Sequence, residues 1–351
     1  MTRKLMTAAV LYGKEDVRIE RVPVPEAGAG EVVVRVAAAL TCGTDLKVYK
    51  RGYHAKMLIP PALFGHEVAG FVDQVGAGVK DFKVGDRVVA LNSAPCDVCF
   101  FCRHDQQNLC DDLVFNNGAY AEYIRIPARI VAKNMLHVPE GVDLTHAALT
   151  EPLACVMLGL RDVHAQPGDT MVVIGAGPIG LLFMHAASLQ GVRVIAVVKR
   201  ESQEQAARAF GATEVVRLDE TQDAIASVRA LTEDQRGADV VIEAVATPMT
   251  WGWSVDMVRK GGVVNFFGGP PAGTRVDLDT NRLHYNNIEL QATFHHTPAS
   301  VREAFTLIGS GRFKSAQYVT GQAALADLPE LFARMANRGA ADCDIKTAIV
   351  S

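Results

Sequence analysis

The pattern of apolar and polar residues changes near residue 141. Before that point, short apolar runs are separated by glycine and proline, as at residues 32–37, 68–75 and 87–90. Short strands at this spacing are typical of a small β-barrel or sandwich. A cysteine-rich segment interrupts the pattern, which resumes at residues 119–127.

After residue 141 the pattern predicts strands and helices in alternation, beginning with a helix over residues 143–161. Alternation of this kind predicts a doubly wound parallel sheet, so the fold class is α/β. The C-terminal part predicts two more helices and a final strand. Strands are expected at residues 172–174, 193–198, 239–243, 263–267 and 344–350, and helices at residues 179–189, 202–210, 298–309 and 328–337.

A glycine-rich turn follows the first strand of this alternation. Residues 171–180 read M-V-V-I-G-A-G-P-I-G, which places G-x-G-x-x-G between an apolar strand and a helix. In that context the three glycines permit a tight turn, close approach of a pyrophosphate and close helix–strand packing. The exposed amides and the helix dipole favour phosphates. The expected cofactor-binding residues are Gly175, Gly177, Pro178, Ile179 and Gly180.

The end of the next strand bears on the choice of nicotinamide cofactor. An NAD site usually has an acidic residue there, which holds the ribose 2′-hydroxyl. This chain instead continues with Lys199 and Arg200, and Glu201 follows only after them. Two cations can pair with a 2′-phosphate, so NADP is favoured over NAD. The alternative is that both cations belong to a solvated start of the next helix.

Four cysteines form a second pattern, C-x2-C-x2-C-x7-C. Four thiolates on a short loop suit a closed tetrahedral site for structural Zn²⁺. A disulfide framework would require a secreted chain, and an iron–sulfur loop would have a closer last cysteine followed by proline, where this chain has Asp111. The expected ligands of the structural zinc are Cys96, Cys99, Cys102 and Cys110.

Length and composition limit the class of protein. A chain of 351 residues exceeds one ordinary core, so two domains are expected. The net charge of −4 and the absence of a lysine–arginine block give no indication of nucleic-acid binding. The apolar N-terminal stretch is interrupted by charged residues without a signal-peptide cleavage region, and the cysteine count is odd. We therefore expect a cytoplasmic protein that does not associate with membranes.

Three separate segments supply ligand types for a further metal. They carry Cys42, His66 and Glu151. Cysteine, histidine and carboxylate ligands with one open position are typical of catalytic zinc. Considered singly, each residue has an alternative role. For His66 it is that of a hydrogen-bonded core histidine, and for Glu151 it is that of a carboxylate on a helix face.

The combined motifs give the chain a resemblance to a known family. Residues 65–79 read G-H-E-x2-G-x5-G-x2-V, and the four-cysteine segment, Glu151-Pro152 and the glycine-rich turn follow. This order resembles the zinc-dependent medium-chain dehydrogenase/reductase (alcohol dehydrogenase) family. The segments Cys42-Gly-Thr-Asp and Glu151-Pro-Leu are most like its polyol (sorbitol) dehydrogenase branch, and the threonine dehydrogenases are close to it.

The resemblance implies two domains and an oligomer. A GroES-like β-rich catalytic domain would comprise residues 1–152 and 290–351, with a zinc lobe at about residues 92–115. A Rossmann domain would comprise residues 153–289. The final strand is expected to return to the first domain. Members are commonly homo-dimers or homo-tetramers joined through Rossmann edge strands, for which residues 263–269 are the candidate.

The resemblance also implies roles at the second metal. Cys42 and His66 match zinc ligands, and Glu67 matches the third ligand of the polyol branch. Glu151 would bind the metal or hold its water. Adjacent residues on a regular strand face opposite sides, so His66 and Glu67 reach one metal only at a bend or through water, and the division between Glu67 and Glu151 stays open. Thr44 would relay the hydroxyl proton, with capping of the following turn as an alternative role.

Two departures from the polyol branch affect the substrate. Lys47 stands where histidine is common, and His295-His296 follow Phe294 where arginine and tyrosine are common. Histidine differs from arginine in hydrogen-bond geometry and in the pH dependence of its charge. We therefore expect a modified sugar alcohol, cyclitol or amino-polyol rather than sorbitol, with His295 and His296 as substrate residues. Packing between the domains is the alternative role for this pair.

These observations predict an NADP-preferring dehydrogenase of secondary alcohols with two Zn²⁺ ions per chain, one catalytic and one structural. A threonine-type amino-alcohol dehydrogenase is the alternative enzyme. A nicotinamide-binding protein that has lost catalysis is the alternative of another class. The expected partner is a small-molecule substrate.

Overall fold

The computed structural model describes residues 4–54, 56–338 and 344–350. It divides into two units. The first comprises residues 1–154 and 296–351, and the second comprises residues 155–295. Each unit has its own sheet and core.

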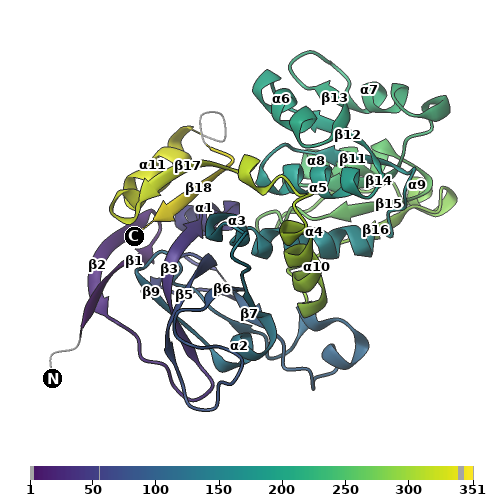
Figure 1. Cartoon of the computed structure of the whole chain (residues 1–351). Helices are drawn as coiled ribbons and strands as arrows, with labels where there is room; N and C mark the ends of the chain where they lie inside the picture. Colours follow the sequence, from purple (N-terminus) through teal and green to yellow (C-terminus); the bar gives the residue numbers. More distant parts are fainter. Residues whose placement is uncertain (1–3, 55, 339–343, 351) are drawn as a thin grey trace. The chain divides into compact units, whose positions relative to one another are not determined.

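A six-stranded sheet forms the centre of the second unit (Figure 1). The strand order is β13-β12-β11-β14-β15-β16, and all neighbours are parallel, which confirms the predicted doubly wound sheet. The order reverses between β11 and β14, and ligands bind at such a reversal. The strands are β11 (Thr170–Ile174), β12 (Arg193–Val198), β13 (Ala212–Arg217), β14 (Ala238–Glu243), β15 (Val258–Phe266) and β16 (Glu289–Gln291).

Helices follow the strands of this sheet. Helix α8 begins with a capping box in which the side chains of Thr247 and Thr250 each accept from the other's backbone amide. The apolar pattern did not predict this helix, because its sequence has no pronounced apolar face. The helices of this unit are α5 (Pro178–Leu189), α6 (Glu201–Ala209), α7 (Ala224–Ala230), α8 (Pro248–Met257) and α9 (Thr280–Tyr285).

The expectation that residues 263–269 form a sheet edge is wrong. These residues begin within β15, which pairs with β14 on one side and with β16 on the other. Strand β16 follows α9 and has only three residues, so neither its length nor its pattern distinguished it as a strand in the sequence. It forms the actual edge.

The first unit is β-rich. Its largest sheet has the order β10-β6-β5-β3-β18-β17, with β9 also paired to β3. A second sheet has the order β2-β1-β4, and a small ladder joins β7 to β8. The strands are β1 (Leu5–Gly13), β2 (Asp16–Pro23), β3 (Val32–Leu40), β4 (Ala62–Leu63), β5 (Glu67–Val75), β6 (Arg87–Ala90), β7 (Ser93–Ala94), β8 (Val114–Phe115), β9 (Tyr123–Ile126), β10 (Met135–His137), β17 (Val319–Ala324) and β18 (Lys346–Val350).

The C-terminal strand confirms the expected return to this unit. Strand β18 pairs antiparallel with β3, with Ala348 opposite Leu40. It is reached through α10 (Pro298–Gly309) and α11 (Leu328–Arg338), which confirm the two helices predicted there. A chain segment more than 300 residues from β1 therefore lies beside the strand that leads to Cys42.

The single helix predicted over residues 143–161 is two helices. Helix α3 (Leu144–Ala147) is capped by the Asp143 side chain, and α4 (Thr150–Asp162) begins after a break of two residues. The break lets α4 start at Thr150, so Glu151 lies in its first turn. The remaining helices of the first unit are α1 (Gly43–Arg51) and α2 (Ala128–Asn134).

Candidate metal centres and dinucleotide site

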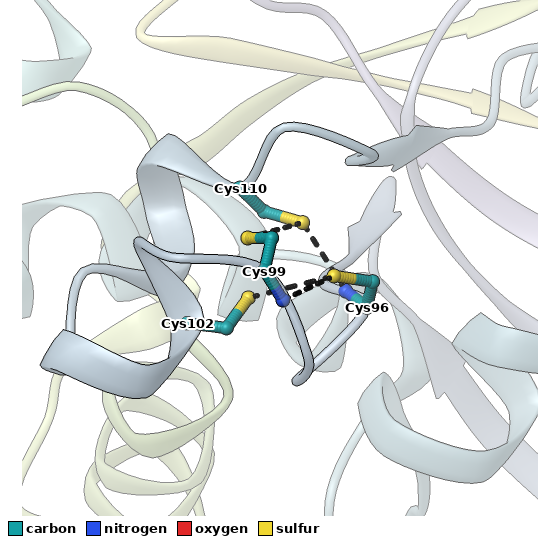
Figure 2. Close-up of side chains that lie close together, drawn as sticks. All are labelled: Cys96, Cys99, Cys102 and Cys110. Atoms are coloured by element: carbon teal, nitrogen blue, oxygen red, sulfur yellow. Dashed lines mark hydrogen bonds between the residues drawn. The ribbon is translucent and has the colours of Figure 1, made fainter.

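The four cysteine sulfurs of the lobe lie together, and Figure 2 shows them turned toward one another. The Cys96 and Cys102 sulfurs are 3.9 Å apart, as are those of Cys99 and Cys110. A Zn–S bond of about 2.3 Å in a tetrahedron gives an S–S edge of about 3.8 Å. The donor set and its spacing therefore fit one zinc ion.

Local backbone geometry prepares the lobe sulfurs for a metal. The amides of Val98 and Cys99 point at the Cys96 sulfur, at 3.4 and 3.3 Å, and the Cys96 amide points at the Cys110 sulfur at 3.2 Å. Backbone amides of Cys102 and Asp111 lower the pKa of Cys99 to about 6. Since thiolates rather than thiols ligate zinc, these amides favour the binding form at Cys99, whereas burial raises the pKa of Cys102 and of Cys110.

Three proposed ligands of the second metal also converge. The ligand atoms of Cys42, His66 and Glu67 lie within 4.8 Å of one another. Cys42 caps the N-terminus of α1, and its sulfur accepts from the Thr44 amide at 3.4 Å. His66 and Glu67 are buried at the start of β5. A thiolate, an imidazole and a carboxylate at this separation are a suitable donor set for zinc.

A bend explains how adjacent residues face the same point. Strand β5 begins at Glu67, so His66 precedes the regular strand. Gly65 has φ +91°, in the left-handed region, and a Cβ there would lie 2.6 Å from the Tyr120 ring. Glycine therefore permits both the turn and the close packing that set the direction of His66.

A buried hydrogen-bond chain supports His66. Its Nδ1 lies 2.9 Å from Asp45 Oδ1, and the Tyr120 hydroxyl donates to Asp45 Oδ2 at 2.6 Å. Burial alone would lower the pKa of His66, but Asp45 and Cys42 together outweigh it and raise that pKa well above its ordinary value. With Nδ1 directed to Asp45, Nε2 is left for a metal. The sequence analysis missed Asp45 and Tyr120; the aspartate three residues after Cys42 was the available signal.

Glu67, the carboxylate of the proposed ligand set, has a cationic partner that the sequence analysis did not identify. Lys346 Nζ lies 2.6 Å from Glu67 Oε1 and 2.7 Å from Oε2. Burial would lower the pKa of Lys346, but Glu67, with smaller effects of Cys42 and Glu151, outweighs burial and raises it. The pair is therefore a buried ion pair of ammonium and carboxylate.

Glu151 belongs electrostatically to the same cluster. It is buried, and burial raises its pKa to about 7. The charges of His66 and Glu67 also affect that pKa. The residue that caps α1 is Cys42 rather than Thr44. The Cys42 side chain accepts the hydrogen bond, and Thr44 supplies the backbone amide.

The two histidines proposed for substrate binding belong to different units. His295 ends the second unit, with φ +66° and its ring beside Phe294. His296 is buried in the first unit, where its Nε2 lies 3.0 Å from Asn92 Oδ1. Burial lowers the pKa of His296 to about 3, so the imidazole is neutral and works through hydrogen bonds alone.

In the second unit, the glycine-rich turn joins β11 to α5. Gly175 has φ +103°, and a Cβ there would lie 2.7 Å from a Val245 methyl group. A Cβ on Gly180 would lie 1.9 Å from the Gly175 oxygen, whereas one on Gly177 would meet no protein atom within 4 Å. Pro178 and Ile179 form the first turn of α5. The space at Gly177 suits a phosphate group at the helix N-terminus.

A buried carboxylate shapes the loop beside this turn. Glu243 ends β14, and its Oε1 accepts from the amides of Val245 and Ala246 at 2.9 and 2.8 Å. The Thr250 hydroxyl donates to the same oxygen at 2.7 Å. Ala246 has φ +75°, a conformation that costs a non-glycine residue about 1 kcal/mol or more. Glu243 thus holds a strained loop against Gly175.

Lys199 and Arg200 follow β12, at the end of the sheet where the glycine-rich turn follows β11. Lys199 is exposed and Arg200 half-buried, directly before α6. Arg200 Nε donates to the Ser202 hydroxyl at 3.1 Å. Among the residues that the structure describes, no carboxylate forms an ion pair with either cation. Both charges therefore remain available to an anion.

Comparisons with known proteins agree with this geometry. Residues 28–139 match the model of the alcohol dehydrogenase GroES-like domain, and residues 178–310 match that of the zinc-binding dehydrogenases. Sorbitol dehydrogenase of Bacillus subtilis is 31% identical over 91% of this chain and 90% of its own. The chain belongs to the zinc-dependent medium-chain alcohol dehydrogenase family. It is thus an oxidoreductase that acts on CH–OH groups with a nicotinamide cofactor, and its relatives include the polyol branch.

Two further relatives bear on substrate and cofactor. L-threonine 3-dehydrogenase of Bacillus subtilis is 32% identical over 90% of this chain and 91% of its own. A putative zinc-binding dehydrogenase from Sinorhizobium meliloti, solved bound to NADP, has a TM-score of 0.90 and 27% identity, with 99% of this chain and 100% of that chain covered. In the described parts of this chain, every helix is too short or too polar to span a bilayer.

Proposed function

We propose that the protein is an NADP-preferring dehydrogenase of polyol-like substrates: modified sugar alcohols, cyclitols or amino-polyols. One zinc ion is held by Cys42 and His66 with Glu67 or Glu151, and a second by the four lobe cysteines. The observation that carries the proposal is the convergence of Cys42, His66 and Glu67, with Asp45 behind the imidazole.

Bound zinc would polarise the substrate oxygen, and bound nicotinamide would accept the hydride from the alcohol carbon or return it to the carbonyl. The chain's own groups prepare this reaction. Asp45 fixes the tautomer of His66, and the Thr44 amide orients the Cys42 sulfur. In oxidation the alcohol loses a hydride and a proton. Thr44, two residues after Cys42, relays that proton.

The preference for NADP rests on Lys199 and Arg200. They stand at the strand end where NAD enzymes place a carboxylate, and no ion pair within the described residues engages them. The ammonium of Lys199 and the guanidinium of Arg200 suit a 2′-phosphate. The NADP-bound relative, which matches this chain over nearly its full length, supports the same choice.

The polyol-like substrate class rests on similarity and on two sequence differences. Relatives named sorbitol dehydrogenase and D-arabinitol dehydrogenase are each 31% identical over more than nine tenths of the chain. The neutral, buried His296 and the adjacent His295 replace an arginine-containing pair, which favours an altered hydroxyl or amino pattern in the substrate.

A threonine-type amino-alcohol is the second candidate substrate. Its specific support is the L-threonine 3-dehydrogenase relative, whose 32% identity is within one percentage point of the 31% of sorbitol dehydrogenase. Both candidates use the same metal site, so they differ only in the groups that contact the substrate beyond the reacting carbon.

The proposal includes a homo-dimer or homo-tetramer in the cytoplasm. The sheet edge at β16 presents unpaired backbone groups that a second copy can extend. A four-thiolate site requires reduced cysteines, as in the cytoplasm. Light scattering of the purified protein measures the number of subunits.

The test is formation of reduced nicotinamide by the purified protein with NADP and with NAD. The panel contains sugar alcohols, cyclitols, amino-polyols and threonine. We expect turnover with one polyol class, faster at limiting NADP than at limiting NAD, and none in Cys42→Ser. The metal content should be two zinc ions per chain in the wild type and one in Cys42→Ser.

Other outcomes separate the parts of the proposal. Turnover with threonine alone would favour the second candidate. Wild-type turnover in Cys42→Ser would refute the metal site. Equal efficiency with both cofactors would refute the role of the two cations while leaving the metal site intact.

A further inference from the structure

A buried lysine on the C-terminal strand connects two of the proposed ligand segments. Lys346 is 1% exposed, and its Nζ lies 2.6 and 2.7 Å from the two oxygens of Glu67. The same nitrogen lies 2.9 Å from the backbone oxygen of Thr41, the residue before Cys42. An ammonium has three N–H donors, and three acceptor atoms surround this one.

The next residue strengthens the connection. The Thr347 amide donates to the Thr41 hydroxyl at 2.9 Å, and the Thr41 amide donates to the Thr347 oxygen at 3.0 Å. Strand β18 also pairs with β3 through Ala348 and Leu40. Thr41, which precedes Cys42, is therefore held by Thr347 and by Lys346, and Lys346 also contacts Glu67.

A lysine at this position is not explained by packing. A buried charge is unfavourable unless it is paired and hydrogen-bonded, and an apolar side chain of similar size would fill the space more simply. The cation lies 279 positions along the chain from its carboxylate partner. Residue 346 also lies outside residues 28–139 and 178–310, where the family models match.

We infer that Lys346 is a positioning residue for the catalytic metal site: it fixes the direction of the Glu67 carboxylate and offsets its charge beside Cys42 and His66. This inference rests on the proposed function. A carboxylate whose two oxygens both accept from an ammonium is a weaker donor toward a metal. Lys346 thus limits the negative charge that Glu67 presents there and keeps the site a strong Lewis acid.

The test uses Co²⁺ as a spectroscopic probe in the full-length protein. Cobalt bound at the lobe also absorbs, so the spectrum of Cys42→Ser is subtracted to isolate the band of the second site. We expect Lys346→Met to shift this band and to lower kcat by about 10-fold or more, as removal of a group behind a metal ligand does. The Kd for NADP should stay within about twofold, because Lys346 is buried and its N–H donors already have partners within the first unit.

A double-variant comparison separates positioning from general stability. If Lys346 acts through Glu67, adding Lys346→Met to Glu67→Gln should change neither the cobalt band nor kcat further. This pair also keeps the test available if Lys346→Met alone fails to fold, because the double variant has no unpaired buried charge. Lys346→Arg, which keeps the charge, should retain a band near that of the wild type.

Three results would overturn the inference. The first is a wild-type band and kcat in Lys346→Met. The second is an equal loss from Lys346→Met in the wild-type and Glu67→Gln backgrounds. The third is unfolding of the double variant while Glu67→Gln folds, since Lys346 would then support the fold independently of Glu67. Identical spectra for the wild type and Cys42→Ser would instead refute the proposed metal site itself, and the inference with it.

Discussion

His66 Nδ1 lies 2.9 Å from Asp45 Oδ1, and both side chains are buried. This contact commits one ring nitrogen to a carboxylate and directs the other away from it. Metal-binding histidines are commonly held in this way. The contact therefore supports the proposed role of His66 as a metal ligand.

Replacing Asp45 with asparagine should weaken the metal site without removing the hydrogen bond entirely. Asparagine keeps the shape of the side chain but loses the charge that raises the basicity of the imidazole. We expect zinc affinity at this site to fall about 10- to 100-fold, together with kcat. Competition with a chromogenic chelator measures the affinity.

Tyr120→Phe is the matched control for this prediction. It removes the hydroxyl that donates to Asp45 Oδ2 but leaves the carboxylate beside His66. Its effect on zinc affinity should be smaller than that of Asp45→Asn. Equal zinc affinity in the wild type and Asp45→Asn would contradict the role assigned to Asp45.

Two glycines of the dinucleotide turn should respond differently to alanine. At Gly180 a Cβ would lie 1.9 Å from the Gly175 oxygen, so Gly180→Ala should destabilise the protein by about 3 kcal/mol or more. At Gly177 a Cβ meets no protein atom within 4 Å, so Gly177→Ala should fold normally but bind cofactor weakly. Thermal unfolding and cofactor titration of both variants check this contrast. Normal cofactor affinity in Gly177→Ala would contradict the pyrophosphate assignment.

The lobe zinc should contribute to stability rather than to the chemical step. Cys96→Ser removes one of four convergent ligands, so we expect loss of one zinc per chain and a lower Tm. Cofactor affinity of the folded fraction should be retained. Cys155→Ser is the control, because this half-buried cysteine belongs to neither cluster and should leave the zinc count unchanged. A full zinc count and unchanged Tm in Cys96→Ser would exclude structural zinc at the lobe.

Neutralising both cations after β12 should reduce the preference for NADP. In the variant Lys199→Gln with Arg200→Gln, we expect the Kd for NADP to rise about 100-fold, as for two lost contacts to a phosphate. The Kd for NAD should change less than about twofold. Arg208→Gln, at the far end of α6 and paired with Glu204, is the control cation. Parallel losses for both cofactors would assign Lys199 and Arg200 to the solvated start of α6.

Local sequence patterns predicted the elements whose physical requirements are local. The strand at residues 193–198, the helix at residues 298–309 and the glycine turn at Gly175 all follow from a few neighbouring residues. The short edge strand β16 and the uniform helix α8 have no such pattern, so they were missed. The break between α3 and α4 was missed because it interrupts an otherwise helical period.

The sequence by itself determined which chemistry the chain can support, because ligand type and close spacing are properties of neighbouring residues. It therefore predicted the cysteine lobe, the dinucleotide turn and the ligand types Cys42, His66 and Glu151, and the family resemblance added Glu67. Only the tertiary structure decided what surrounds these groups. Tyr120 reaches Asp45 across 75 positions and Lys346 reaches Glu67 across 279, because strand pairing between distant segments brings them together. Such contacts depend on sheet register, which no short stretch of sequence specifies.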